Sequence, residues 1–140
     1  MSKVFLGGTC NDSHWREQLI PLLKIEYYNP IVSSWTAEIQ KEELHQREIC
    51  DFCLYVITPK MEGVYSIAEV IDDSNKRPEK TIFCYLDEDD DMKFSATQKK
   101  SMDAVCEMIK QNHAKVFSNL NEIADYLNSA SIKQLNTQNL

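Results

Sequence analysis

Runs of apolar residues alternate with runs of mixed polar and apolar residues along most of this chain. Continuous apolar runs occupy residues 3–7, 52–58 and 80–86, a pattern typical of strands that are buried on both faces. Shorter runs at 26–30 and 114–117 complete a set of five expected strands. Apolar residues at helical spacing predict helices over residues 13–24, 34–50, 66–75, 95–112 and 119–127.

This alternation predicts an α/β fold: a single-domain, doubly wound, mostly parallel five-stranded sheet flanked by helices, of the flavodoxin-like or Rossmann-like kind. We expect one domain over residues 1–128, a normal single-domain length. Residues 129–140 are expected to form a polar tail that frays or lies on a neighbouring subunit. Pro21 lies inside the first helical pattern and should kink or break that helix.

The charge of the chain narrows the class of partner. Fifteen Lys and Arg against 22 Asp and Glu leave a formal charge of −7, which argues against a protein that grips nucleic-acid phosphates or an anionic membrane. A small-molecule ligand is therefore expected, without a nucleic-acid or membrane partner. No apolar run approaches the ~20 residues of a membrane span, and the start of the chain lacks the pattern of a signal peptide, so we expect a cytoplasmic protein.

The cysteines and the acidic run do not indicate metal or redox chemistry. The five cysteines lie mostly in apolar surroundings and are interpreted as reduced core thiols. Cys50 and Cys53 match the C-x-x-C spacing, but Cys53 falls inside a predicted strand, whereas redox motifs of this form open a helix. The acids at 87–91 lack the alternate spacing and the glycine of a calcium loop and are interpreted as a solvated loop. We expect no metal and no cofactor.

The fold predicts where a ligand would bind. In an open parallel sheet, ligands bind beside the carboxyl ends of the strands, on loops that lead into helices. Here the first such loop carries two adjacent glycines, the second an amide and a tryptophan, and the third ends in a carboxylate, Glu69. The candidate ligand contacts are Gly7, Gly8, Thr9, Arg16, Asn29, Trp35, Gly63, Tyr65 and Ser66.

Two carboxylates have structural readings that compete with a catalytic one. Ser66-x-x-Glu69 matches a capping box, in which Ser66 caps the helix and Glu69 bonds back to its backbone N–H. Glu43 stands four residues before Arg47 and could form a pair with it on a solvated helix face. The alternative places both carboxylates in a pocket.

Three short motifs occur in order: "VFLGGT", then "DFCLYVI" with an acid eight residues before its aspartate, then "GVYSIAE". In this order and spacing they resemble the nucleoside 2-deoxyribosyltransferases, and in particular the short, phage- and bacteria-associated branch of that superfamily. The resemblance covers roughly residues 3 to 86. Two departures are visible, because Gly63 stands six residues before Glu69 instead of four and Tyr65 replaces the usual glycine.

The resemblance implies roles for particular residues. It makes Glu69 the nucleophile, matches Glu43 to the acid that precedes the third strand, and implies that Gly7, Gly8 and Thr9 line a sugar and base pocket. It also implies a homo-oligomer, since members commonly build the pocket across a subunit interface.

The chemistry of such a pocket follows general rules. Breaking an N-glycosidic bond passes through an oxocarbenium-like sugar, which benefits from a carboxylate below the anomeric carbon and a proton donor near the departing base. Glu43 would hold a sugar hydroxyl, orient Glu69 or share its proton. Trp35 and Tyr65 would stack on the base, Asn29 and Ser66 would hydrogen-bond the sugar or phosphate, and Arg16 and Lys60 are the available cations for a 5′-phosphate.

Three classes of function remain open from the sequence. The first is an enzyme that transfers or hydrolyses the N-glycosidic bond of (deoxy)nucleosides or nucleotides through a glutamate nucleophile. The second is a catalytically inactive protein that binds or senses nucleotides in the same pocket. The third is a TIR-like NAD glycohydrolase, which also places a glutamate on a parallel-sheet scaffold.

Overall fold

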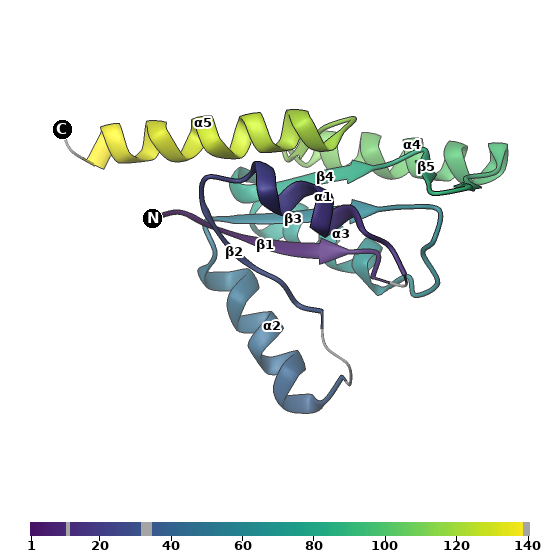
Figure 1. Cartoon of the computed structure of the whole chain (residues 1–140), viewed down its shortest axis with the longest axis horizontal. Helices are drawn as coiled ribbons and strands as arrows, with labels where there is room; N and C mark the ends of the chain where they lie inside the picture. Colours follow the sequence, from purple (N-terminus) through teal and green to yellow (C-terminus); the bar gives the residue numbers. More distant parts are fainter. Residues whose placement is uncertain (11, 32–34, 139–140) are drawn as a thin grey trace.

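The computed structural model describes residues 1–10, 12–31 and 35–138. A five-stranded sheet lies at its centre, with the strand order β2-β1-β3-β4-β7, and every neighbouring pair is parallel (Figure 1). This confirms the predicted doubly wound α/β architecture. The strands of the sheet are β1 (Lys3–Gly8), β2 (Glu26–Tyr28), β3 (Phe52–Ile57), β4 (Thr81–Tyr85) and β7 (Lys115–Val116).

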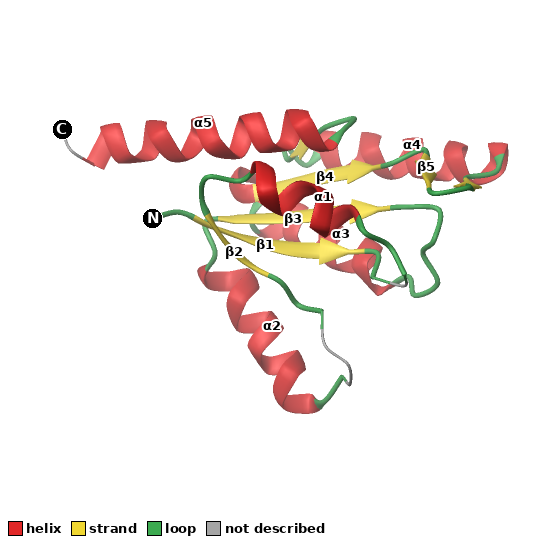
Figure 2. Cartoon of the chain, viewed as in Figure 1, coloured by secondary structure: helices red, strands yellow, loops and turns green. Residues whose placement is uncertain are grey.

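Helices cover both faces of the sheet, as Figure 2 shows. The helices α1 (Trp15–Leu19) and α5 (Leu120–Gln138) supply apolar side chains to the core on one face. The helices α3 (Tyr65–Lys76) and α4 (Ala96–Gln111) do the same on the other face. The sheet is therefore the middle layer of three, which is what the continuous apolar runs of its strands require.

The central strand β3 shows how the sequence pattern produces these layers. All six of its side chains are buried. Successive side chains of a strand point to opposite faces, so Leu54 and Val56 join the core beneath α1 and α5, whereas Tyr55 and Ile57 join the core beneath α3 and α4. A strand covered on both sides has no solvent-facing position, and this explains why it carries no polar alternation.

The helix α2 (Ala37–Ile49) is placed differently from the others. It begins after Thr36, whose hydroxyl accepts a hydrogen bond from the Ile39 backbone N–H at 3.2 Å. From its junction with β3 it projects away from the sheet (Figure 1), and among its residues only Gln46 and Arg47 are buried. The rest of α2 is therefore free to form one wall of a pocket.

The first helical region ends where the sequence predicts, and the last one does not. The first helical region breaks at Pro21 as expected: α1 ends at Leu19, and a 3₁₀ turn (Ile20–Leu22) with the proline at its start follows. The last helix was expected to end at Leu127 before a polar tail. Instead α5 continues to Gln138 and extends beyond the sheet at its C-terminal end (Figure 1).

The acidic run at 87–91 is a hairpin in part and not simply a solvated loop. Its strands β5 (Glu88–Asp89) and β6 (Met92–Lys93) pair in antiparallel register. Asp90 at the turn adopts a left-handed backbone with φ of 55°, a conformation that aspartate tolerates better than most residues. The Asp90 carboxylate accepts a hydrogen bond from Lys60, so the hairpin is tied to the loop that follows β3.

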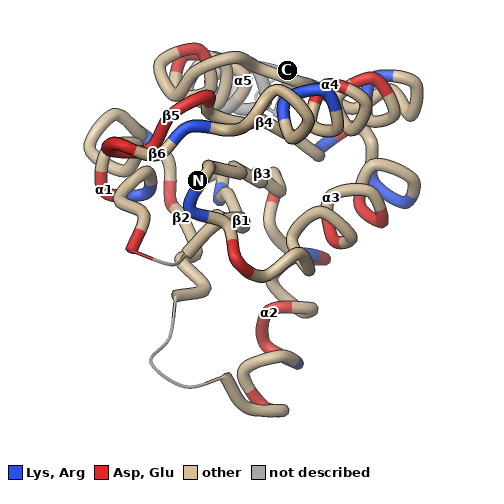
Figure 3. Tube along the Cα trace, turned by 90° about the vertical axis from the view of Figure 1, so that its right-hand side faces the viewer, with Lys and Arg blue, Asp and Glu red and all other residues tan. Residues whose placement is uncertain are grey.

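Lysine and arginine positions are interspersed with acidic ones along the helices in the view of Figure 3. Within the described part of the chain, no helix is both long enough and apolar enough to span a membrane.

Candidate functional site

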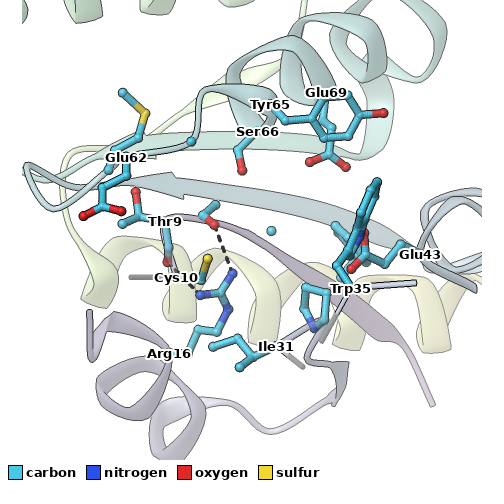
Figure 4. A pocket seen from close by; sticks show the side chains of 16 residues that line it. Thr9, Cys10, Arg16, Ile31, Trp35, Glu43, Glu62, Tyr65, Ser66 and Glu69 are labelled. Atoms are coloured by element: carbon cyan, nitrogen blue, oxygen red, sulfur yellow. Dashed lines mark hydrogen bonds between the residues drawn. The ribbon is translucent and has the colours of Figure 1, made fainter. Parts of the chain in front are cut away.

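A pocket of about 330 Å³ opens beside the carboxyl ends of β1 and β3, between the start of α3 and the wall formed by α2 (Figure 4). This is the edge of the sheet at which parallel α/β folds bind ligands. Its size suits a small organic molecule. The pocket is lined by Phe5, Gly7, Gly8, Thr9, Cys10, Arg16, Pro30, Ile31, Trp35, Glu43, Met61, Glu62, Gly63, Tyr65, Ser66 and Glu69.

The floor of the pocket depends on glycine at the end of β1. Gly8 has φ of +122°, and a Cβ atom there would lie 2.0 Å from the Val56 carbonyl oxygen, so only glycine fits. The turn that follows is fastened to β3, because the Thr9 N–H donates to the same Val56 carbonyl at 2.9 Å and the Thr9 hydroxyl accepts from the Thr58 N–H at 3.0 Å. The first loop is thereby fixed against the neighbouring strand.

Arg16 lies at one side of the pocket and is only 3% exposed. Its guanidinium donates to the carbonyl oxygens of Leu6 at 3.0 Å, Thr9 at 2.7 Å and Gly8 at 3.4 Å, so it holds the turn after β1 in place. Burial lowers the pKa of Arg16 to about 10, which leaves it protonated at neutral pH. Backbone carbonyls do not neutralise its charge, and this side of the pocket is cationic.

The start of α3 overturns the capping interpretation of Glu69. The helix begins at Tyr65 with Val64 in the capping position, and no side chain forms a cap hydrogen bond there. Ser66 therefore sits inside the first turn, and of the two competing readings the capping box is excluded. The Glu69 carboxylate and the Ser66 hydroxyl instead point from α3 into the pocket (Figure 4).

Glu43 is likewise a pocket residue and not part of a solvated ion pair. It projects from α2, and its Oε2 accepts a long hydrogen bond of 3.5 Å from the Trp35 indole N–H. Arg47, its partner in the alternative reading, is buried, and its ion pairs run to α3. The structure therefore favours the pocket position of Glu43 over the alternative i,i+4 pair. Figure 4 shows Glu43 and Trp35 together on the side of the pocket away from Glu62.

Both pocket carboxyl groups have raised pKa values. Burial raises the pKa of Glu69 to about 7, against the opposing charge of Arg47, and the negative charges of Glu43 and Asp73 add to the increase. Burial also raises the pKa of Glu43, against the hydrogen bond from Trp35. Two interacting acids with perturbed pKa values in one cleft are suited to covalent and acid–base chemistry near neutral pH.

The structure brings most of the predicted ligand contacts to this pocket. Asn29 is the exception, because its Oδ1 accepts a hydrogen bond from the Ile31 N–H at 3.2 Å in a local turn, and Pro30 and Ile31 line the pocket instead. Lys60, considered as a cation for a phosphate, pairs with the acidic hairpin. Arg16 is thus the cationic side chain that lines the pocket.

Sequence reasoning missed the residues that lie behind Glu69. Arg47, Asp73 and Tyr55 form a buried polar cluster between α2, α3 and β3. A signal was present, because Asp73 stands four residues after Glu69 and Arg47 four residues after Glu43, so each shares a helix face with a pocket carboxylate. Only the packing of the two helices shows that the pairs meet across the interface.

Comparison with known proteins agrees with the motifs and the fold. A family model described as nucleoside 2-deoxyribosyltransferase like matches residues 1–88, which include β1, β3, the start of α3 and every residue that lines the pocket. No curated protein matches the chain. The match extends over more than half of the sequence. The chain therefore belongs to the nucleoside 2-deoxyribosyltransferase-like family.

Proposed function

We propose that this protein cleaves or transfers the N-glycosidic bond of (deoxy)nucleosides or nucleotides, with Glu69 as the nucleophile. One observation carries this proposal: carboxylates from two different helices, Glu69 of α3 and Glu43 of α2, line the same pocket at the carboxyl edge of the sheet. Glu69 has no capping role that would account for it. The family match supports a nucleoside or nucleotide as the substrate class.

In the first step, a Glu69 oxygen attacks C1′ of the sugar while the C1′–N bond breaks. The electron pair of that bond stays on the base nitrogen, which accepts a proton from the Glu43 carboxyl group. The product is a glycosyl ester on Glu69 and a free base. Glu43 is assigned this role because it lines the same pocket from a different helix and burial raises its pKa above the usual value.

In the second step, a nitrogen of another base attacks C1′ and the Glu69 carboxylate leaves. The proton of the attacking nitrogen passes to the Glu43 carboxylate, which restores both groups. Water in place of the second base would make the reaction a hydrolysis. The same residues therefore support transfer or hydrolysis, and the outcome depends on which acceptor the pocket admits.

Aromatic rings stand ready to hold the base. Trp35 is 57% exposed and Tyr65 is 54% exposed, although both line the pocket. Large rings with free faces at a pocket are suited to stacking on a planar heterocycle. A base stacked on these rings would bury their exposed apolar faces, which is favourable.

The proposal is tested by product analysis. The protein, Glu69→Gln and Glu62→Gln are each incubated with deoxynucleosides, their 5′-monophosphates, ribonucleosides and NAD, with and without free adenine, and the bases are separated by chromatography. Glu62→Gln is the matched control, because Glu62 also lines the pocket but lies on a different side of it from Glu69 (Figure 4).

We expect base release or exchange that is lost in Glu69→Gln and kept in Glu62→Gln. A glycosyl adduct on the Glu69 peptide, found by mass spectrometry after rapid quenching, would identify the covalent step. Nucleoside binding without turnover by the unmodified protein would overturn the proposal in favour of a binding protein, and release of nicotinamide alone would favour an NAD glycohydrolase.

A further inference from the structure

The Glu69 carboxylate lies against a buried cation. Arg47 Nη1 is 3.6 Å from Glu69 Oε2, and the two side chains are only 4% and 11% exposed. The arginine belongs to α2 and the glutamate to α3, so the contact joins two helices behind the pocket. A charge pair so well shielded from water is much stronger than one on the surface.

A second carboxylate holds Arg47 in this position. Arg47 Nε donates to Asp73 Oδ2 at 3.2 Å, and Arg47 Nη2 donates to Asp73 Oδ1 at 2.9 Å. Asp73 is fully buried, and its Oδ2 also accepts a hydrogen bond of 2.5 Å from the Tyr55 hydroxyl of the central strand. This two-point contact fixes the plane of the guanidinium, and Nη1 is the nitrogen left to face Glu69.

Arginine is the residue type that this arrangement requires. Its planar group can bind Asp73 through two nitrogens and still present the third to another carboxylate, whereas the single nitrogen of lysine cannot do both. Burial alone would lower the pKa of Arg47, but its hydrogen bond to Asp73 and the surrounding negative charges raise it instead, so the cation is permanent.

The charged groups around Glu69 pull in opposite directions. Arg47 of α2 favours the ionised carboxylate, whereas Glu43 of α2 and Asp73 of its own helix oppose ionisation. Tyr55 of β3 acts through Asp73, and Arg16 lines the same pocket at a different side. Arg47 is thus the cation in ion-pair contact with Glu69 that offsets its burial.

We propose that Arg47, clamped by Asp73 and Tyr55, is a positioning residue that orients the Glu69 carboxylate and favours its ionised form for attack on the sugar. This inference rests on the proposed role of Glu69 as nucleophile. Arg47 contacts Glu69 from behind the pocket and is absent from the pocket lining, so it acts through the glutamate and not on the substrate.

The direct test is a titration of Glu69 that needs no turnover. Protein labelled with ¹³C at the glutamate side-chain carboxyl is followed by NMR from pH 4 to pH 9, and the Glu69 signal is assigned by its loss in Glu69→Gln. We expect Arg47→Lys to raise the titration midpoint of Glu69 from about 7 by on the order of one pH unit. The single nitrogen of the lysine would pair with Asp73, and Glu69 would lose its cationic partner. An unchanged or lower midpoint would overturn the inference.

Asp72→Asn is the matched control. Asp72 also accepts a hydrogen bond from Arg47, at Nη2 and 3.1 Å, but its side chain is 42% exposed and its removal leaves the contact with Asp73 intact. The midpoint of Glu69 should stay in place in this variant. A shift as large as that in Arg47→Lys would show a general response to charge removal and would overturn the specific role of the clamp.

A second variant keeps the test decisive if Arg47→Lys does not fold. Tyr55→Phe retains both charges and removes only the hydroxyl bound to Asp73. Asp73 then carries more unshared negative charge beside Glu69 and draws Arg47 more strongly, so the midpoint should rise, by less than in Arg47→Lys. A midpoint identical to that of the unmodified protein in folded Tyr55→Phe would contradict the clamp.

The kinetic readout separates this inference from the proposed function. The value of kcat/KM is measured as a function of pH for each variant. If Glu69→Gln loses turnover, but Arg47→Lys changes neither the Glu69 titration midpoint nor the acidic side of the kcat/KM profile, the proposed function stands and the inference about Arg47 fails. If no nucleoside is turned over but the midpoint shifts as expected, the coupling of Arg47 to Glu69 stands and the proposed reaction fails.

Discussion

The Trp35 indole N–H donates to Glu43 Oε2 at 3.5 Å, which joins the loop after β2 to the protruding helix α2 at one side of the pocket. The aromatic ring that we assign to the base and the carboxyl group that we assign to proton transfer are thereby placed side by side. A base stacked on Trp35 would lie next to its proton donor.

This arrangement predicts separate roles for the ring face of Trp35, which would stack on the base, and for its indole N–H, which contacts Glu43. Trp35→Phe keeps a smaller aromatic face and loses the N–H, whereas Trp35→Ala loses the aromatic face and the N–H. We expect Trp35→Ala to raise KM about tenfold, corresponding to about 1.4 kcal/mol of lost stacking, and Trp35→Phe to raise it much less. Melting temperatures should barely change, because the side chain is 57% exposed. Equal KM values for the two variants would show that the ring face does not bind the base.

Glu43→Gln should lower the pKa of Glu69. The charge of Glu43 contributes to the raised pKa of Glu69, and a neutral amide of the same shape removes that contribution. The Glu69 midpoint, followed by the same ¹³C titration, is expected below about 7 in Glu43→Gln and above it in Arg47→Lys. Shifts in the same direction in both variants would contradict the opposing roles of these two neighbours.

The burial of Glu69 should be visible in the pH dependence of stability. The folded pKa of Glu69, about 7, exceeds the usual glutamate value of 4.5, so the folded state binds the proton more tightly than the unfolded state. The resulting stabilisation is complete below about pH 4.5 and is lost as pH rises through 7. Relative to Glu69→Gln, which does not titrate, the unmodified protein should lose about 3 kcal/mol over this range.

Urea unfolding of the two proteins at pH 4.5, 6, 7 and 8 measures this difference directly. A constant difference between them would show that Glu69 is solvated in the folded state. If the unmodified protein instead gains stability over Glu69→Gln between pH 4.5 and pH 8, the pKa of Glu69 is lowered by folding and not raised. Glu69 would then have a structural role as an ionised partner of Arg47.

Substitutions of Arg16 and of Lys60 should differ in their effect on substrates that carry a 5′-phosphate. The measured quantity is the ratio of kcat/KM for a deoxynucleoside 5′-monophosphate to that for the deoxynucleoside. We expect Arg16→Gln to lower this ratio at least about tenfold, since a charge-assisted phosphate contact is worth roughly 1.5–3 kcal/mol. Lys60→Gln should leave it unchanged, because Lys60 pairs with Asp89 and Asp90. Taking a ratio on each variant cancels damage to the turn that Arg16 also holds.

Alanine substitution should destabilise the fold at one pocket glycine, Gly8, and leave it unchanged at another, Gly63. Gly8→Ala would place its Cβ 2.0 Å from the Val56 carbonyl oxygen on a backbone with positive φ, so we expect a loss of more than about 2 kcal/mol or failure to fold. Nothing lies within 4 Å of a Cβ at Gly63, so Gly63→Ala should fold normally. Thermal melts of both variants check the pair, and a well-folded Gly8→Ala would contradict the fastening of β1 to β3.

The order of the strands and helices, and their parallel arrangement, followed from the sequence. A strand such as β3 that is buried on both faces has to be apolar throughout, and helices that pack on the sheet, such as α3 and α4, have to be amphipathic. Both patterns can be recognised in the sequence. Pro21 announced the break in the first helix for the same reason, since its effect on the backbone is local. The approximate position of the pocket followed too, because ligand sites of open parallel sheets lie at one edge.

The roles of Ser66, Glu69 and Arg47 could not be read in the same way. Ser66 stands three residues before Glu69, which is the spacing of a capping box. Glu43 stands four residues before Arg47, which is the spacing of an ion pair on a helix surface. Each rule is local, and the local rule failed where a distant segment offered a different partner: α2 brings Arg47 to Glu69 and Asp73 across the helix interface.

The sequence by itself determined the fold class, the edge of the sheet at which a site would form and the residue types available there, because these depend on periodicity and on short-range backbone chemistry. The tertiary structure alone decided which carboxylates face the pocket, which cation stands behind Glu69 and which cation, Lys60, is already paired. Burial and long-range contacts set those outcomes, and neither leaves a mark at a fixed spacing in the chain.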